Sequence, residues 1–96
     1  MEHCEIFPGR RGMNSKVADS FWRSYEALPA EVQGLALKNF RLWLSNPQHP
    51  SLHFKRFKNE FWSARVGGHY RAIGYFRDSD TFVWIWIGTH EDYNKF

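Results

Sequence analysis

The sequence NPQHPS at 46–51 divides the chain into two parts with different periodicity. Before it, apolar residues recur three or four positions apart, which is typical of amphipathic helices. After it, short runs of alternating apolar and polar residues are separated by turn sequences, which is typical of antiparallel strands. The chain has 96 residues, which is the size of one small domain, so this order restricts the fold to helices followed by a sheet.

Two helices are predicted before the loop. The first is carried by an apolar stripe within 19–28, and the side chain of Asp19 or Ser20 is its predicted N-cap. Pro29 ends this helix and can begin the next, because its missing N–H costs nothing in a first turn. The second helix, over about 30–45, has a broad apolar stripe. A short strand at 15–18 is predicted to precede both helices.

The second half of the chain predicts an antiparallel meander. Its strands are expected at about 53–58, 61–66, 70–76 and 81–87, with Gly67-Gly68 as a tight turn and a short helix from about Thr89. The strand at 81–87 is the most apolar, which places it at the centre of the sheet. The predicted fold class is therefore α+β: an N-terminal helical hairpin packed on a small antiparallel sheet, with a short C-terminal helix.

The domain is predicted to span residues 14–96. Residues 1–13 have no usable periodicity and contain Pro8, Gly9 and Gly12, so they are expected to form a flexible N-terminal extension. Met13 is an alternative start of translation.

Composition excludes several classes of protein. The single cysteine rules out an internal disulfide and a multi-cysteine metal site, and it favours a reduced, cytoplasmic setting. The apolar runs fall short of the roughly 18 residues needed to span a bilayer, so no membrane association is expected. The histidines have no paired cysteine or carboxylate frame, so neither a metal nor another cofactor is predicted.

Positive charge is concentrated in the strand region. Six Lys or Arg residues within 53–77 face only one acid, Glu60, whereas four acids after Arg77 face only Lys95. Clustered cations among aromatic residues suit a polyanion such as nucleic acid. The alternative is a solvated strand face on which Lys and Arg stems cover apolar surface.

Several segments resemble the RelE/ParE toxin superfamily. YRAIGY (70–75) is similar to its Tyr-Arg strand, FWSARVGG (61–68) to the strand before it, and WIWIGTHEDY (84–93) to its last strand with a Gly-Thr-His ending. LPAEVQGLALKNF (28–40) resembles the second helix of its hairpin, and the whole resemblance covers about 16–96. It implies a toxin that is neutralised by a cognate antitoxin. Many members cleave mRNA on the ribosome, whereas the ParE branch inhibits DNA gyrase.

Metal-free RNA cleavage uses the 2′-OH to attack the adjacent phosphate. It needs a base, a cation that stabilises the phosphorane, and an acid for the leaving oxygen. The resemblance and this chemistry assign phosphate binding to Arg71 and the acid role to His90, with Arg65 and Lys55 as further catalytic candidates. Lys55 would grip a phosphate or, if desolvated, act as a base. The alternatives are a salt bridge for Arg71 and a purely surface position for His90.

Other residues are predicted to bind RNA without taking part in the reaction. These are His53, Lys58, His69, Tyr93 and Phe96. Tyr93 and Phe96 would stack on a splayed base, and their alternative is packing of the tail onto the sheet. The neighbouring Glu91 and Asp92 could orient His90 but would also repel RNA.

The sequence therefore predicts a cytoplasmic type II toxin that acts as a ribosome-dependent mRNA endoribonuclease. Its partners would be a cognate antitoxin, mRNA and the ribosome. One alternative is a non-nucleolytic inhibitor of DNA gyrase. The other is a non-catalytic member of the fold that only binds a protein partner.

Overall fold

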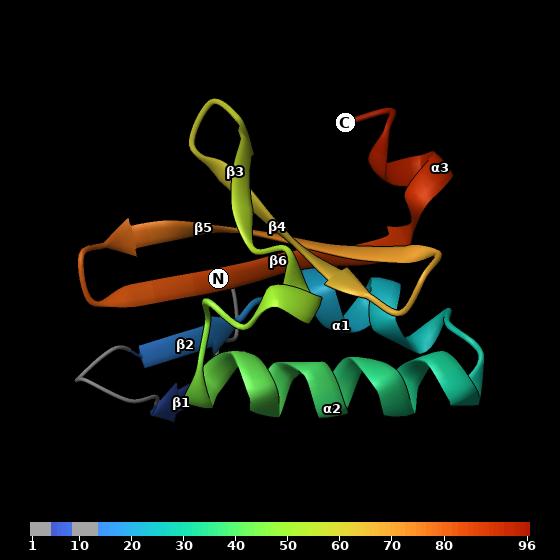
Figure 1. Cartoon of the computed structure of the whole chain (residues 1–96), viewed down its shortest axis with the longest axis horizontal. Helices are drawn as coiled ribbons and strands as arrows, with labels where there is room; N and C mark the ends of the chain where they lie inside the picture. The colour runs from blue at the N-terminus through green and yellow to red at the C-terminus, as the bar shows by residue number, and fades with distance from the viewer. Residues whose placement is uncertain (1–4, 9–13) are drawn as a thin grey trace.

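A helical layer covers one face of a six-stranded sheet in the computed structural model, which describes residues 5–8 and 14–96 (Figure 1). The predicted α+β fold class is confirmed. In chain order the elements are β1 (Glu5–Pro8), β2 (Asn14–Val17), α1 (Asp19–Glu26), α2 (Ala30–Ser45), a 3₁₀ helix (Pro50–Leu52), β3 (Lys55–Lys58), β4 (Phe61–Val66), β5 (Tyr70–Asp78), β6 (Thr81–Thr89) and α3 (His90–Tyr93). Helix α3 and the C-terminus lie on the side of the sheet away from α2 (Figure 1).

The strand order is β1-β2-β6-β5-β4-β3. Strands β3 to β6 form the predicted antiparallel meander, and β6 is central, with β5 on one side and β2 on the other. The pairing of β2 with β6 is parallel, so the sheet is mixed rather than antiparallel throughout. The helical hairpin and three strands separate β2 from β6 along the chain, so no tight turn imposes an antiparallel arrangement on them.

Strand β1 extends the sheet beyond β2. It pairs antiparallel, with Glu5 opposite Val17 and Pro8 opposite Asn14. It falls within the stretch 1–13 for which the sequence predicts a flexible extension, so four of these residues form an edge strand. Residues 1–4 and 9–13 lie outside the described residues, and the domain boundary at residue 14 stays a prediction.

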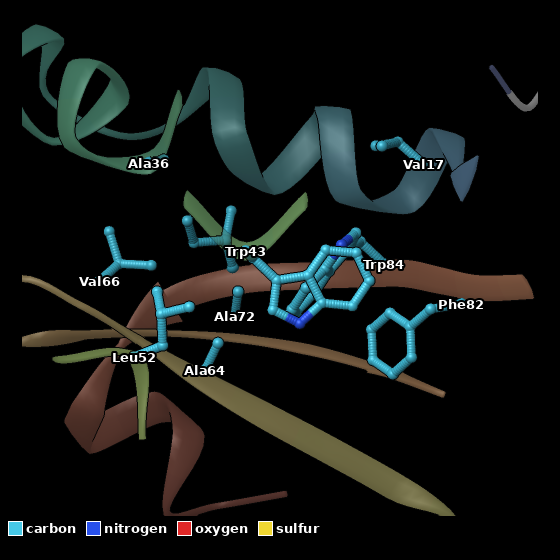
Figure 2. Close-up of a cluster of buried hydrophobic side chains, with 10 residues drawn as sticks. Val17, Ala36, Trp43, Leu52, Ala64, Val66, Ala72, Phe82 and Trp84 are labelled. Carbon is cyan, nitrogen blue, oxygen red and sulfur yellow. The ribbon is translucent and has the colours of Figure 1, made fainter. Parts of the chain in front are cut away.

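In the core between the two layers, the aromatic rings of Trp43, Phe82 and Trp84 lie among smaller aliphatic side chains (Figure 2). The ring of Trp43 on α2 packs on Phe82 and Trp84 of β6, with centroids 5.3 and 5.2 Å apart. Small side chains, including Ala64 and Ala72, lie on the facing strands. Large rings bury much apolar surface per residue, which helps so short a chain to form a stable core.

Two hydroxyl groups of α1 bind the backbone of β6 at an irregularity. The β5–β6 register shifts so that Ile85 has no partner in β5. Ser20 Oγ donates to the Ile85 carbonyl at 2.7 Å, and the Ile87 N–H donates to Ser24 Oγ at 3.0 Å. The predicted N-cap of α1 is wrong, because Ala18 is the N-cap and no side chain caps the helix. Ser20 is engaged with the sheet instead.

Candidate nucleic-acid interface

The face of the sheet opposite α1 and α2 carries basic side chains. Ala64 and Val66 of β4 belong to the core, so Arg65 between them projects from the other face. The core residue Ala72 of β5 likewise places its neighbour Arg71 on that face. The structure therefore places cations on the face that α1 and α2 leave uncovered, as the sequence predicts, and we call it the open face.

Arg65 and Arg71 are direct register partners across β4 and β5. Gly88 of β6 is the next residue in this row. A Cβ atom on Gly88 would lie 2.3 Å from the Trp86 ring, so the indole occupies the space that a side chain would need. Arg65 and Arg71 thus lie side by side across the two strands, and the Trp86 indole lies over the next position, Gly88. Like charges directly opposite each other in a sheet repel, so an anion bound between them is favoured.

No acidic side chain within residues 5–8 and 14–96 forms a salt bridge with Arg65 or Arg71. Partial burial and the positive charge of Arg65 lower the pKa of Arg71, and the nearby Tyr93 offsets part of this change. Arg71 Nη1 donates to the carbonyl of Tyr70 at 2.8 Å, whereas Arg65 Nε is buried without a hydrogen-bond partner. Among the residues that the structure describes, the one ion pair joins Lys95 to Asp92. The salt bridge considered for Arg71 is therefore not observed.

Lys55 lies beside the arginine pair on the edge strand. It is opposite Ser63 in the β3–β4 register, and Ser63 projects from the open face two positions before Arg65. Lys55 is exposed, so the desolvation that a base role would require is missing in the free protein. Its position suits contact with a phosphate.

Helix α3 is tied to the open face by one side-chain hydrogen bond and one backbone hydrogen bond. The hydroxyl groups of Tyr93 and Ser63 are 3.1 Å apart, and Ser63 is only 2% exposed. The His90 N–H donates to the His69 carbonyl at 2.7 Å, at the turn between β4 and β5. The His90 and Tyr93 rings are stacked with centroids 5.9 Å apart. These contacts hold the exposed His90 and the half-buried Tyr93 on the side of the sheet that carries Arg71.

The tail after α3 returns to the sheet. The Phe96 ring packs on Trp86 with centroids 4.8 Å apart, and Lys58 Nζ donates to the Phe96 carbonyl at 2.8 Å. Phe96 nevertheless keeps 42% of its surface exposed. The sequence predicts either packing of the Phe96 ring on the sheet or its exposure to a ligand, and in the structure the ring does both.

The predicted histidines differ in their relation to the arginine pair. His69 is exposed in the β4–β5 turn and contacts His90 through its backbone. His53 is the C-cap of the 3₁₀ helix in a left-handed conformation, with φ of 46°. No hydrogen bond or ion pair within 5–8 and 14–96 joins His53 to the arginine pair, so the structure gives no link between them. The acid Asp92 pairs with Lys95 at 3.7 Å on the surface, and Glu91 is exposed.

The structure adds Ser63, Phe57 and Asn94 to the residues found from sequence. Strand alternation puts Ser63 on the same face as Arg65, but only the packing of α3 reveals its contact with Tyr93. A shallow hollow between β3 and the C-terminal segment is lined by Lys55, Arg56, Phe57, Lys58, Tyr93, Asn94 and Phe96. The sequence gives no signal for this hollow, because its two walls are far apart along the chain.

Within 5–8 and 14–96, no group of three His, Cys, Asp or Glu side chains lies close enough to hold a metal ion. No helix in this part of the chain is long and apolar enough to cross a membrane.

A helical hairpin on one face of a small sheet, with a basic opposite face, is the arrangement expected from the resemblance to the RelE/ParE superfamily. Residues 31–95 match the family described as ParE-like toxin domain, and the chain therefore belongs to this family of toxins. The resemblance found in the sequence is confirmed. A comparison with the sequences of curated proteins gave no significant match.

Two solved structures show the same fold at low identity. A chain from the RelBE2 toxin–antitoxin complex of Mycobacterium tuberculosis has a TM-score of 0.64 and 18% identity, and the match covers 79% of this chain and 95% of that one. A copper-bound mutant toxin from Helicobacter pylori has a TM-score of 0.56 and 14% identity, with coverage of 81% and 94%.

Proposed function

We propose that this toxin is a ribosome-dependent endoribonuclease that cleaves mRNA in the cytoplasm and so stops translation. The observation that carries the proposal is the Arg65–Arg71 pair on the open face, whose charge no acid in the described residues compensates. A like-charge pair that is partly buried favours a bound anion, and the phosphates of RNA are the anions that this chemistry requires.

The groups around the pair support a metal-free transesterification. The 2′-oxygen attacks phosphorus, its proton is taken up by a base, and the bond to the 5′-oxygen breaks to leave a cyclic phosphate. Arg65 and Arg71 would stabilise the phosphorane, since guanidinium groups offer forked donors and keep their charge. His90 would donate the proton to the leaving 5′-oxygen. Lys55 would grip a neighbouring phosphate or, once RNA binding removes water from it, take up the 2′-OH proton.

Tyr93 would support this arrangement in two ways. Its hydroxyl is fixed by Ser63, and its ring stacks against His90. A histidine that is exposed but backed by an aromatic ring keeps a preferred orientation while it remains in contact with solvent. Tyr93 would thus position His90 and offer an aromatic surface to RNA.

The proposed protein partner is a cognate antitoxin. The RelBE2 structure, whose fold this chain shares, is a toxin–antitoxin complex. An antitoxin that covers the open face would block access to Arg65 and Arg71. Co-expression with the small reading frame next to the toxin gene should therefore remove toxicity and yield a stable complex.

A second candidate function is inhibition of DNA gyrase without nuclease activity. The matching family is described as ParE-like, which favours this candidate. The two functions are separated by adding purified toxin to a cell-free translation reaction and, in parallel, to a gyrase supercoiling reaction. The proposal expects loss of translation with unchanged supercoiling, and Arg71→Ala should restore translation whereas the exposed α2 variant Lys38→Ala should not. Inhibited supercoiling with intact translation would replace the proposal with the gyrase function.

A further inference from the structure

We propose that the cavity between the helical hairpin and the sheet is a binding site for a small neutral aromatic compound that carries a carbonyl oxygen. The cavity has a volume of about 340 Å³ and lies on the face of the sheet that α1 and α2 cover. The inference therefore does not depend on the proposed ribonuclease function. It is carried by the apolar walls of the cavity and by two buried indole N–H groups that have no partner.

The cavity lies where short side chains of the two layers face each other. Ala36 of α2, Ala64 of β4 and Ala72 of β5 all line it, and their methyl groups leave the space between helix and sheet unfilled. Ala64 and Ala72 are the chain neighbours of Arg65 and Arg71. A ligand in the cavity would thus lie against the two strands whose other face carries the arginine pair.

The size and walls of the cavity suit a flat aromatic compound. An apolar cavity of about 150 Å³ can hold benzene, so the larger volume suits a bicyclic ring system. Aromatic rings pack favourably on one another through stacked and edge-to-face contacts. Six aromatic side chains line the cavity, namely Phe21, Trp22, Tyr25, Phe40, Trp43 and Trp84.

Two of these side chains carry hydrogen-bond donors that the fold leaves unused. Trp43 and Trp84 are only 1% and 4% exposed, and neither indole N–H has a partner within 5–8 and 14–96 (Figure 2). A buried donor without a partner is costly and calls for an explanation. The two rings pack edge to face with centroids 5.2 Å apart, so both donors are within reach of one small ligand. An indole N–H only donates, so the matching group is an acceptor.

Water is a poor match for these donors. A buried water molecule needs about two to four polar partners, and the walls around the indoles are apolar. The side-chain amide of Asn39 also lines the cavity, but it donates to the Arg65 carbonyl at 3.2 Å. No acidic side chain is among the lining residues, so a cationic ligand is not favoured. A carbonyl oxygen on an apolar ring accepts from the indoles and fills the remaining volume.

The cavity opens to solvent between the two helices. Leu37 of α2 lines it and is 40% exposed, Arg41 one turn later is exposed, and Trp22 of α1 is half-buried. Side chains at a helix surface change rotamer on the picosecond to nanosecond timescale, so a small molecule can pass them without unfolding of the core. The site is therefore reachable in the folded protein.

The test is a titration of the ¹⁵N-labelled full chain with 1-indanone and, separately, with indane, followed by NMR at the indole N–H resonances. The two probes share one bicyclic frame and differ in the carbonyl oxygen. 1-Indanone should shift the Trp43 and Trp84 indole resonances downfield and bind about tenfold more tightly than indane. Trp43→Phe and Trp84→Phe assign the two resonances. Ala36→Leu fills the cavity and should abolish binding, whereas Ala30→Leu, the same change at the exposed first residue of α2, should preserve it.

Three results would overturn the proposed site. The first is unchanged indole resonances of Trp43 and Trp84 up to the solubility limit of 1-indanone, the second is equal affinity for the two probes, and the third is wild-type binding by a folded Ala36→Leu variant. If Ala36→Leu does not fold, the comparison of the two probes on the wild-type protein decides alone. Cleavage of RNA is a separate measurement, so failure of this site and failure of the proposed function are distinguishable.

Discussion

Arg65 and Arg71 lie opposite each other in the antiparallel register of β4 and β5, on the open face of the sheet. Direct cross-strand neighbours of like charge destabilise a sheet, by an amount on the order of 0.2–1 kcal/mol. Nothing in the core requires this pair, because both side chains project away from it. A bound anion explains the pair, because a phosphate between the two guanidinium groups attracts both and offsets their mutual repulsion.

The first prediction concerns stability. Arg71→Gln removes the repulsion with Arg65, so the free energy of unfolding should be unchanged or higher by up to about 0.5 kcal/mol at low salt. Sulfate should stabilise the wild-type protein more than chloride at equal ionic strength, and Arg71→Gln should lose the part of this effect that comes from binding. Thermal unfolding measures both quantities. Lys38→Gln serves as the control for the general effect of sulfate on stability. If sulfate stabilises Arg71→Gln as much as Lys38→Gln, no anion binds at the arginine pair.

The second prediction separates binding from chemistry. His90 is exposed, and its backbone N–H, rather than its ring, contacts His69. His90→Ala should therefore retain RNA affinity and lose roughly 10²–10⁴-fold in cleavage rate, as expected for loss of a general acid. Arg71→Ala should lose both. Cleavage of mRNA on purified ribosomes gives the rate, and the exposed α2 variant Lys38→Ala serves as the control. Full cleavage by His90→Ala would assign the acid role to another group.

The third prediction concerns the contact between Ser63 and Tyr93. Ser63→Ala removes a hydrogen bond of 3.1 Å that joins α3 to β4, at an expected cost of about 1 kcal/mol. Urea unfolding measures this cost, and hydrogen exchange should show faster exchange of the amides in α3. Ser45→Ala is a suitable control, because its hydroxyl bonds within α2 to the Leu42 carbonyl. Unchanged exchange in α3 would show that other contacts hold the helix.

The fourth prediction tests the packing of β5 on β6. A Cβ atom on Gly74 would lie 2.4 Å from both the Phe82 ring and the Val83 carbonyl, so Gly74→Ala forces the two strands apart. A loss of about 2–4 kcal/mol is expected, as for other overpacked cores. Gly68→Ala has no atom within 4 Å of the new Cβ and should be nearly neutral. Denaturant unfolding compares the two, and equal stabilities would contradict the described β5–β6 packing.

Local sequence accounts for most of the fold. The periodicity within 30–45 and the Gly67-Gly68 turn predict α2 and the β4–β5 hairpin, because both depend on neighbouring residues. The parallel pairing of β2 with β6 and the irregularity at Ile85 could not be predicted, since they are set by packing between distant segments. Ser20 shows the difference: its residue type predicts a helix N-cap, but in the structure its hydroxyl donates to the Ile85 carbonyl of β6.

The candidate site was partly accessible from sequence for the same reason. Alternation along β4 and β5 predicts that Arg65 and Arg71 lie on the same, solvent-facing side of the sheet. That the two residues are direct partners follows only from the strand register in the structure. Ser63 and Phe57 depend on where α3 folds back, which no local pattern encodes.

The central claim is that the open face cleaves translated mRNA, and the most direct measurement is to map RNA ends after brief expression of the toxin in cells. The wild-type protein should produce new 5′-hydroxyl ends within translated reading frames, paired with 2′,3′-cyclic phosphates. Arg71→Ala and His90→Ala should not, although Lys38→Ala should match the wild-type pattern. Growth arrest by the wild-type protein with no new RNA ends, or the same ends in all four proteins, would contradict the account.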